Sequence, residues 1–150
     1  MCFMGCMEKG CCLVSVSRIC DLIKLDFLTT EGESVCLHVQ TSIFRGLKQN
    51  KLLISSQDIY LPSKHYKKKK FIKFKWDVPG NSLFDDQMLD FKKEFLNKKI
   101  EEIKIIGKDL VIDFGDGLLI ELLCCTLEEE RELYRVFKKG DLESHIIVET

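Results

Sequence analysis

The feature of this sequence that most constrains its fold is an internal echo between two segments in the first and last parts of the chain. The first copy covers residues 23–27 and 35–39, and the second covers residues 110–114 and 118–122. In both copies apolar residues alternate with others, an Asp-Phe pair ends the first run, and a turn containing glycine follows. Alternation with a period of two is typical of half-buried strands joined as a hairpin. The echo therefore predicts a duplicated, mainly antiparallel fold.

The segments around each predicted hairpin repeat as well. A strand-like run precedes each one, at residues 13–19 and 100–106, and a short β-rich run closes each copy, at 52–54 and 146–148. Between them lie polar stretches with arginine, around Arg45 and around Arg131 and Arg135. We expect about four strands in each half, with halves at residues 13–60 and 100–149 of a single domain spanning 1–150. An α+β sandwich or partly closed barrel would let each half bury the other's apolar stripe.

The connector at residues 61–99 contains a basic loop and a predicted helix. Alternation over residues 71–76 places Ile72, Phe74 and Trp76 on one face and favours a half-buried strand. Ser82, with Asp85 three positions later, is typical of a helix start. Phe84, Met88, Phe91 and Phe95 then follow at helical spacing. Residues 127–134 are rich in helix formers, but a strand over residues 133–136 competes with a helix there.

The formal net charge of −1 hides an asymmetry between the halves. Residues 1–76 contain 13 Lys and Arg against 6 Asp and Glu, whereas residues 77–150 contain 10 against 18. Such a chain can present faces of opposite sign. No apolar run reaches the roughly 18–20 residues that span a bilayer, and the first residues, with starts at Met1, Met4 or Met7, do not read as a signal peptide. We therefore expect a cytoplasmic protein with reduced thiols among its eight cysteines.

No catalytic, cofactor or metal site is predicted. His38 falls on the outward phase of a strand, and no nucleophile elbow surrounds a serine or cysteine. Asp26 and Asp113 end matched strands, where a carboxylate more often satisfies backbone donors of the turn than performs acid–base chemistry. The cysteines near the N-terminus lack the two close pairs separated by a loop that zinc sites favour.

Two charged segments are candidate contact surfaces. Glu128, Glu129, Glu130 and Glu132 form an acidic stretch that could imitate a nucleic acid toward a basic partner such as a nuclease. Lys67, Lys68, Lys69 and Lys70 belong to a run, residues 64–76, in which lysines and aromatics alternate. Such a run is typical of binding to an acidic protein or, alternatively, to nucleic acid.

The stretches at residues 21–45 and 109–136 resemble small uncharacterised bacterial proteins, some of which are similar to immunity proteins of contact-dependent or polymorphic toxin systems. The resemblance rests on hydrophobic strand patterns and covers most of the chain from about residue 13 onward. It implies a stoichiometric binder of a toxin domain and transfers no catalytic residue. The leading hypothesis is therefore a protein-binding module, with a nucleic-acid-binding accessory protein and an unrecognised enzyme as alternatives.

Overall fold

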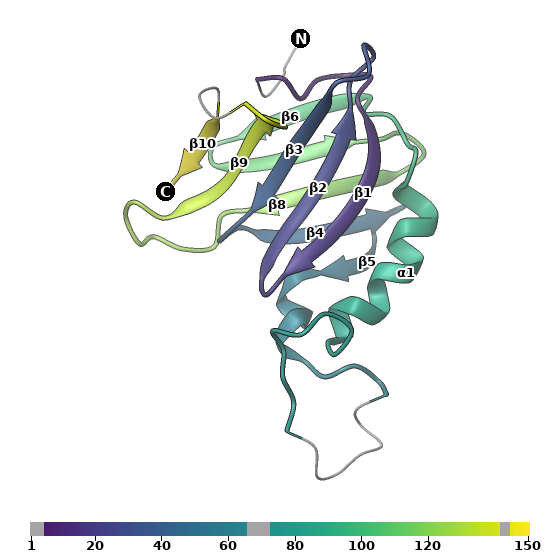
Figure 1. Ribbon diagram of the computed structural model, residues 1–150, viewed down its shortest axis with the longest axis vertical. Coiled ribbons are helices and arrows are strands. Elements are labelled where there is room, and N and C mark those ends of the chain that lie inside the picture. Colours follow the sequence, from purple (N-terminus) through teal and green to yellow (C-terminus); the bar gives the residue numbers. More distant parts are fainter. Residues whose placement is uncertain (1–4, 66–72, 142–144) are drawn as a thin grey trace.

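The computed structural model describes residues 5–65, 73–141 and 145–150, which form two antiparallel sheets and one long helix (Figure 1). Sheet I has the order β1 (Cys12–Ile19), β2 (Leu22–Leu28), β3 (Ser34–Val39), β9 (Glu132–Lys138) and β10 (Ile146–Glu149). Sheet II has the order β5 (Lys51–Ser55), β4 (Ile43–Lys48), β8 (Leu118–Leu123), β7 (Asp109–Asp113) and β6 (Glu102–Ile106). A 3-10 helix, η1 (Ser56–Tyr60), and the helix α1 (Leu83–Phe95) follow β5 in the chain.

The two halves of the chain exchange strands across an approximate two-fold arrangement. The first half gives β1, β2 and β3 to sheet I and sends β4 and β5 to sheet II. The second half does the reverse, with β6, β7 and β8 in sheet II and β9 and β10 in sheet I. The contacts between halves are therefore backbone ladders, β3 with β9 and β4 with β8. The predicted duplication is confirmed as a sandwich, and the sheets do not close into a barrel.

The inward faces of the echoed hairpins form the centre of the core. Ile23, Leu25 and Phe27 of β2 are buried, as are Leu110 and Ile112 of β7. Because side chains alternate across a strand, the polar residues between them point outward. The shorter hairpin turns through three residues with positive φ, Gly115, Asp116 and Gly117, and the Asp113 carboxylate accepts a hydrogen bond from the Gly115 N–H at 2.8 Å. The predicted turn role of Asp113 is thereby confirmed.

Helix α1 follows its prediction closely. Ser82 and Asp85 form a capping box, and Phe84, Met88, Phe91 and Phe95 are all buried in the core. Phe91 lies over β4 so closely that a Cβ on Gly46 would be 2.7 Å from its ring. A glycine at that position therefore lets the helix approach sheet II. Within the described part of the chain, no helix has the length and apolar character to cross a membrane.

Two expectations about the strands are wrong, and one alternative that the sequence left open is decided. Each half has five strands rather than four, because the polar stretches around Arg45 and Arg135 are the strands β4 and β9, whose arginines take outward positions. Residues 73–76 form no strand: the carbonyl of Lys75 accepts from the Val78 N–H, and that of Trp76 accepts from Arg18. Residues 71 and 72 lie outside the described residues. Of the two alternatives for residues 127–134, the strand is correct, and it begins at Glu132.

Candidate partner-binding surface

Arg18, near the end of β1, holds three segments of the chain together at one end of the sandwich. Its side chain is only 2% exposed, and its guanidinium pairs with the Asp85 carboxylate through contacts of 2.8 and 2.7 Å. The same group donates to the carbonyls of Cys20, Trp76 and Val78 at 2.7, 2.9 and 3.1 Å. Arg18 thus fixes the β1–β2 turn, the end of the connector and the start of α1 relative to one another.

Five largely apolar side chains lie on the segments that Arg18 holds and on the end of η1, which Ser82 links to Arg18 by accepting from it at 3.1 Å and donating to the Ile59 carbonyl at 2.5 Å. We call them the aromatic patch: Ile19, Tyr60, Leu61, Trp76 and Val78. All but Trp76 are exposed, and the half-buried Trp76 ring lies 5.1 Å from the ring of Tyr60. The Tyr60 hydroxyl donates to the Asp21 carboxylate at 3.0 Å. Burial is the larger cause and this hydrogen bond the second cause that raise the pKa of Tyr60, so the phenol keeps its proton and remains a donor. Exposed apolar side chains that cluster in this way commonly mark binding surfaces.

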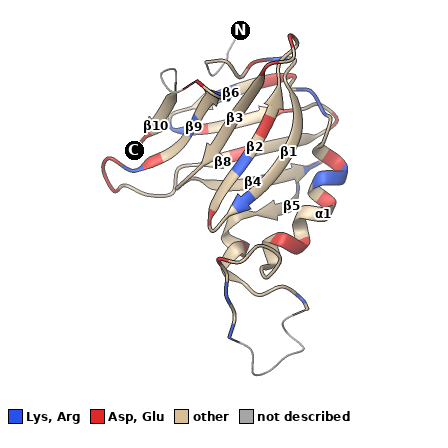
Figure 2. Ribbon diagram, viewed as in Figure 1, with Lys and Arg blue, Asp and Glu red and all other residues tan. Residues whose placement is uncertain are grey.

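The acidic loop, residues 126–130, lies between β8 and β9, where Figure 2 shows it in red and apart from the blue lysines of the connector. Leu127 is fully exposed at its head, directly before Glu128, Glu129 and Glu130, which are also exposed. Thr150 fastens the loop, because its hydroxyl donates to the Glu128 carbonyl and accepts from the Arg131 N–H. The loop therefore presents a leucine among carboxylates in a held conformation.

The acidic loop and the aromatic patch border the same region of the surface. A hollow of about 190 Å³ lies between them, lined by Tyr60 on the patch side and by Cys125, two residues before Leu127, on the loop side. The β3–β4 link forms its floor and is tied to the start of β9, because the Thr41 hydroxyl donates to the Glu132 carbonyl at 2.7 Å. We treat the patch, the hollow and the loop as one candidate partner-binding surface.

Glu132, the fourth predicted acidic contact, is less free than its neighbours. The register of β9 shifts beside it, and its carboxylate pairs with the Arg135 guanidinium. That hydrogen bond lowers the pKa of Glu132. The pair therefore buttresses the loop, and the exposed charges Glu128, Glu129 and Glu130 are left to meet a partner.

Two of the three histidines, His38 and His145, occupy packing positions on and beside the outer face of sheet I, whereas His65 is exposed in the connector. His38 meets the Phe137 ring edge-on with ring centres 4.8 Å apart, and His145 stacks on the same ring at 4.3 Å. The outward placement of His38 is confirmed. Its pKa is lowered mainly by burial and, second, by the positive charge of Lys24. His145 Nδ1 lies 3.2 Å from the Arg135 guanidinium, which can only donate. His145 Nε2 faces the Asp141 carbonyl at 2.9 Å.

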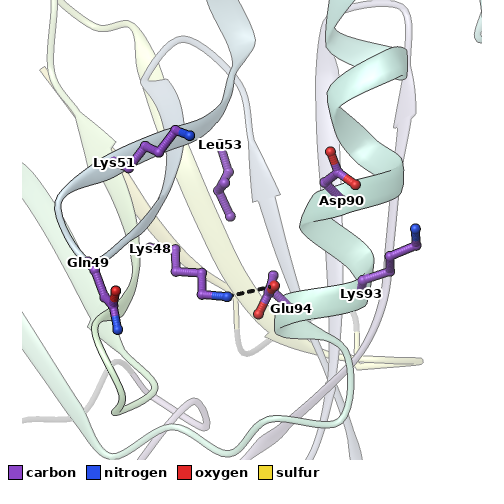
Figure 3. Close-up of a pocket in the computed structure, with 7 residues that line it drawn as sticks. All are labelled: Lys48, Gln49, Lys51, Leu53, Asp90, Lys93 and Glu94. Carbon is purple, nitrogen blue, oxygen red and sulfur yellow. Dashed lines mark hydrogen bonds and ion pairs between the residues drawn. The ribbon is translucent and has the colours of Figure 1, made fainter.

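A separate groove of about 440 Å³ lies between β5 and α1 (Figure 3). Its lining carries charges of both signs, and Lys48 reaches across it to Glu94 at 2.8 Å. The positive charges of Lys51 and Lys93 are offset by the negative charges of Asp90 and Glu94. The groove therefore has little preference for a ligand of either charge. We do not assign a function to it.

The remaining positions that the sequence singled out are the connector lysines, Asp26 and the cysteines. Lys67, Lys68, Lys69 and Lys70 lie outside the described residues. Asp26 is not a turn ligand like Asp113, and its carboxylate instead accepts from the Cys36 thiol at 3.2 Å. Within the described residues, no group of three histidine, cysteine or acidic side chains could hold a metal ion, and the seven cysteines there are free thiols.

Sequence reasoning missed Arg18 and the aromatic patch. One signal was present, because Arg18 follows Val16 on the buried phase of β1, and charged residues are seldom buried without a partner. The patch gave no signal, since it is assembled from three distant segments. Comparison with known proteins adds no identification: no family model, curated protein or solved structure matches the chain.

Proposed function

We propose that this chain is a non-catalytic protein-binding module that holds a basic partner on the surface formed by the aromatic patch, the hollow and the acidic loop. The observation that carries the proposal is Leu127, which is fully exposed among three exposed glutamates, two residues after Cys125 in the wall of a hollow that Tyr60 of the aromatic patch also lines. Soluble proteins seldom leave such groups together in water unless a partner covers them.

The two parts of the surface would contribute differently to binding. Apolar anchors buried at the centre of an interface supply most of its affinity, and tyrosine and tryptophan are frequent among them. Charges at the rim mainly speed association and select the partner's sign. Tyr60 and Leu127 are thus the expected anchors, whereas Glu128, Glu129 and Glu130 would select a partner with a basic surface.

The finer proposal is a cytoplasmic immunity protein that neutralises a toxin domain, as the sequence resemblance implies. A nuclease is a suitable partner because the surface that binds the phosphate backbone is positively charged. Held carboxylates around an apolar anchor could cover that surface and exclude the nucleic acid. The placement of both histidines against Phe137, rather than beside a nucleophile, supports a binder over an enzyme.

Affinity capture with three baits tests the proposal. The baits are the unaltered chain, Leu127→Asp, and the control Ile106→Asp, which changes an exposed residue on the distant edge strand β6. We expect a basic protein to bind the unaltered chain and the control and to elute as salt is raised. The amount captured should fall at least tenfold with Leu127→Asp. Equal recovery by all three baits would contradict the proposed surface.

Nucleic-acid binding remains the second candidate, because the Tyr60 and Trp76 rings lie on the connector side with the exposed Lys73 and Lys75. Bases stack on aromatic rings while lysines contact phosphates. Anisotropy of a labelled single-stranded oligonucleotide at low salt separates the two candidates. Affinity that falls steeply with salt would favour this alternative, and the absence of binding at low salt would exclude it.

A further inference from the structure

The hollow between the aromatic patch and the acidic loop has a defined chemical character. Most of the residues that line it are polar, and Asp21 is the one charged residue that lines it within the described part of the chain. At about 190 Å³ it is smaller than the roughly 300–1,000 Å³ of pockets that hold cofactors and drug-sized ligands. A single side chain from a partner is a better match for its size than a separate small molecule.

Two groups in the hollow have unused binding capacity that is open to a partner. The Asp21 carboxylate accepts from Tyr60 through Oδ2 only, so Oδ1 has no hydrogen bond within the described residues. The Tyr60 ring is 52% exposed and lines the hollow. Ser42, also in the lining, is only 5% exposed, and its hydroxyl has no hydrogen-bond partner among the described residues. The Ser42 oxygen itself has almost no solvent-accessible surface, so the contacts that are open to a partner are those of Asp21 and Tyr60.

We propose that this hollow binds the side chain of an arginine presented by the partner, an inference that rests on the proposed function. A guanidinium offers a planar set of donors that matches a carboxylate, and its flat face stacks on aromatic rings. Asp21 supplies the carboxylate and Tyr60 supplies the ring, which is also suited to a cation–π contact. A lysine would supply only a point charge and no flat face, so arginine fits both features.

A titration followed by ¹H–¹⁵N NMR on the full chain tests the inference with a defined probe. N-acetyl-arginine methylamide is expected to bind in the millimolar range and to shift the backbone amides of Ser42, Gln57 and Cys125. N-acetyl-citrulline methylamide has nearly the same shape without the charge, and we expect it to bind at least tenfold more weakly. Equal shifts from both probes, or shifts spread over the surface, would overturn the inference.

Two pairs of variants identify the groups responsible, and their spectra also report whether each variant is folded. Asp21→Asn should weaken arginine binding at least fivefold, whereas Asp116→Asn, which changes an exposed carboxylate in the β7–β8 turn, should leave it unchanged. Tyr60→Leu should weaken binding severalfold, and Tyr60→Phe should retain it because the ring remains. The assigned contacts would be refuted if both control variants lost arginine binding. They would also be refuted if Asp21→Asn and Tyr60→Leu both kept it.

Failure of this inference is distinguishable from failure of the proposed function. Leu127→Asp should abolish capture of the partner and leave arginine binding intact, because Leu127 does not line the hollow. If the arginine probe fails to bind while capture still depends on Leu127, the hollow is not an arginine site and the protein-binding proposal stands. If the probe binds and capture is independent of Leu127, the proposed docking surface is wrong.

Discussion

Asp85 is the residue whose replacement most directly tests the architecture of the Arg18 contacts. Asp85→Asn keeps the size of the side chain but removes the charge that pairs with Arg18, whose side chain is 2% exposed. The carboxylate also accepts from the N–H groups of Gly80 and Ser82, at 2.8 and 3.0 Å. Both N–H groups donate to Oδ2, so an asparagine oxygen at that position can still accept from them. Its NH2 group would then replace the oxygen that accepts from Arg18 Nε, and the guanidinium would lose its counter-charge.

The expected loss follows from the burial of this pair. Breaking a buried ion pair by removing one partner costs about 3–5 kcal/mol, because the remaining charge stays desolvated. Asp85 is 15% exposed, and water can reach part of the site, which places the estimate toward the lower end of that range. We therefore expect the free energy of unfolding to fall by about 3 kcal/mol.

Urea unfolding followed by tryptophan fluorescence and by circular dichroism measures this loss. The control is Asp90→Asn on the exposed side of the same helix, where a change within about 0.5 kcal/mol is expected. A loss below about 1 kcal/mol for Asp85→Asn would fall outside the range for a buried pair and would show that Arg18 is adequately held by carbonyls alone.

The same contact predicts a dependence on pH. Burial alone would raise the pKa of Asp85, but hydrogen bonds from Arg18 and from the N–H groups of Ser82 and Gly80 outweigh it and lower the pKa below its ordinary 3.8. A carboxyl whose pKa is lower when folded stabilises the fold above its unfolded pKa. Stability should therefore fall as the pH drops below 3.8, and this acid-dependent loss should be smaller in Asp85→Asn.

Further predictions concern the core. Burial raises the pKa of Tyr134 to about 12, and its hydroxyl has no partner within the described residues. Tyr134→Phe should therefore raise the free energy of unfolding, measured in urea, by about 1–3 kcal/mol. An unchanged or lower value would mean that the hydroxyl has a hydrogen-bond partner. Gly46→Ala would place a methyl group 2.7 Å from the Phe91 ring, and we expect a loss of about 1–3 kcal/mol. Gly32→Ala has open space but a positive φ, so its cost should come from the backbone and be about 1 kcal/mol. Thermal melts of all three variants provide a second measurement. Equal losses of stability in the two alanine variants would contradict the role of the close approach at Gly46.

The sequence predicted the parts of the fold that depend on local pattern. The hairpin at β2 and β3, its counterpart at β7 and β8, and the apolar face of α1 were all evident from periodicity. The strand β4 was not, and β9 was only one of two alternatives, because an arginine interrupts each one and their strand character depends on ladders with β8 and β3 from the other half. Local propensity cannot report a pairing partner that lies so far along the chain.

The candidate surface was predictable only in its charged part. Glu128, Glu129 and Glu130 could be singled out because a run of like charges is visible in one stretch of sequence. Their apolar companions could not, since Ile19, Tyr60 and Val78 come from three distant segments. Arg18 contacts the segments of Ile19 and Val78 directly and that of Tyr60 only through Ser82. The basic candidates at Lys67, Lys68, Lys69 and Lys70 stay a prediction.

The exchange of strands between halves gives the connector an unusual task. Neither half can complete a sheet from its own strands, because its last two strands belong to the sheet that the other half begins. Two separate copies of one half could satisfy the same ladders by trading those strands with each other, and they would then be a dimer. By tying the halves into one chain, the connector replaces that bimolecular encounter with an intramolecular one, so assembly no longer depends on protein concentration.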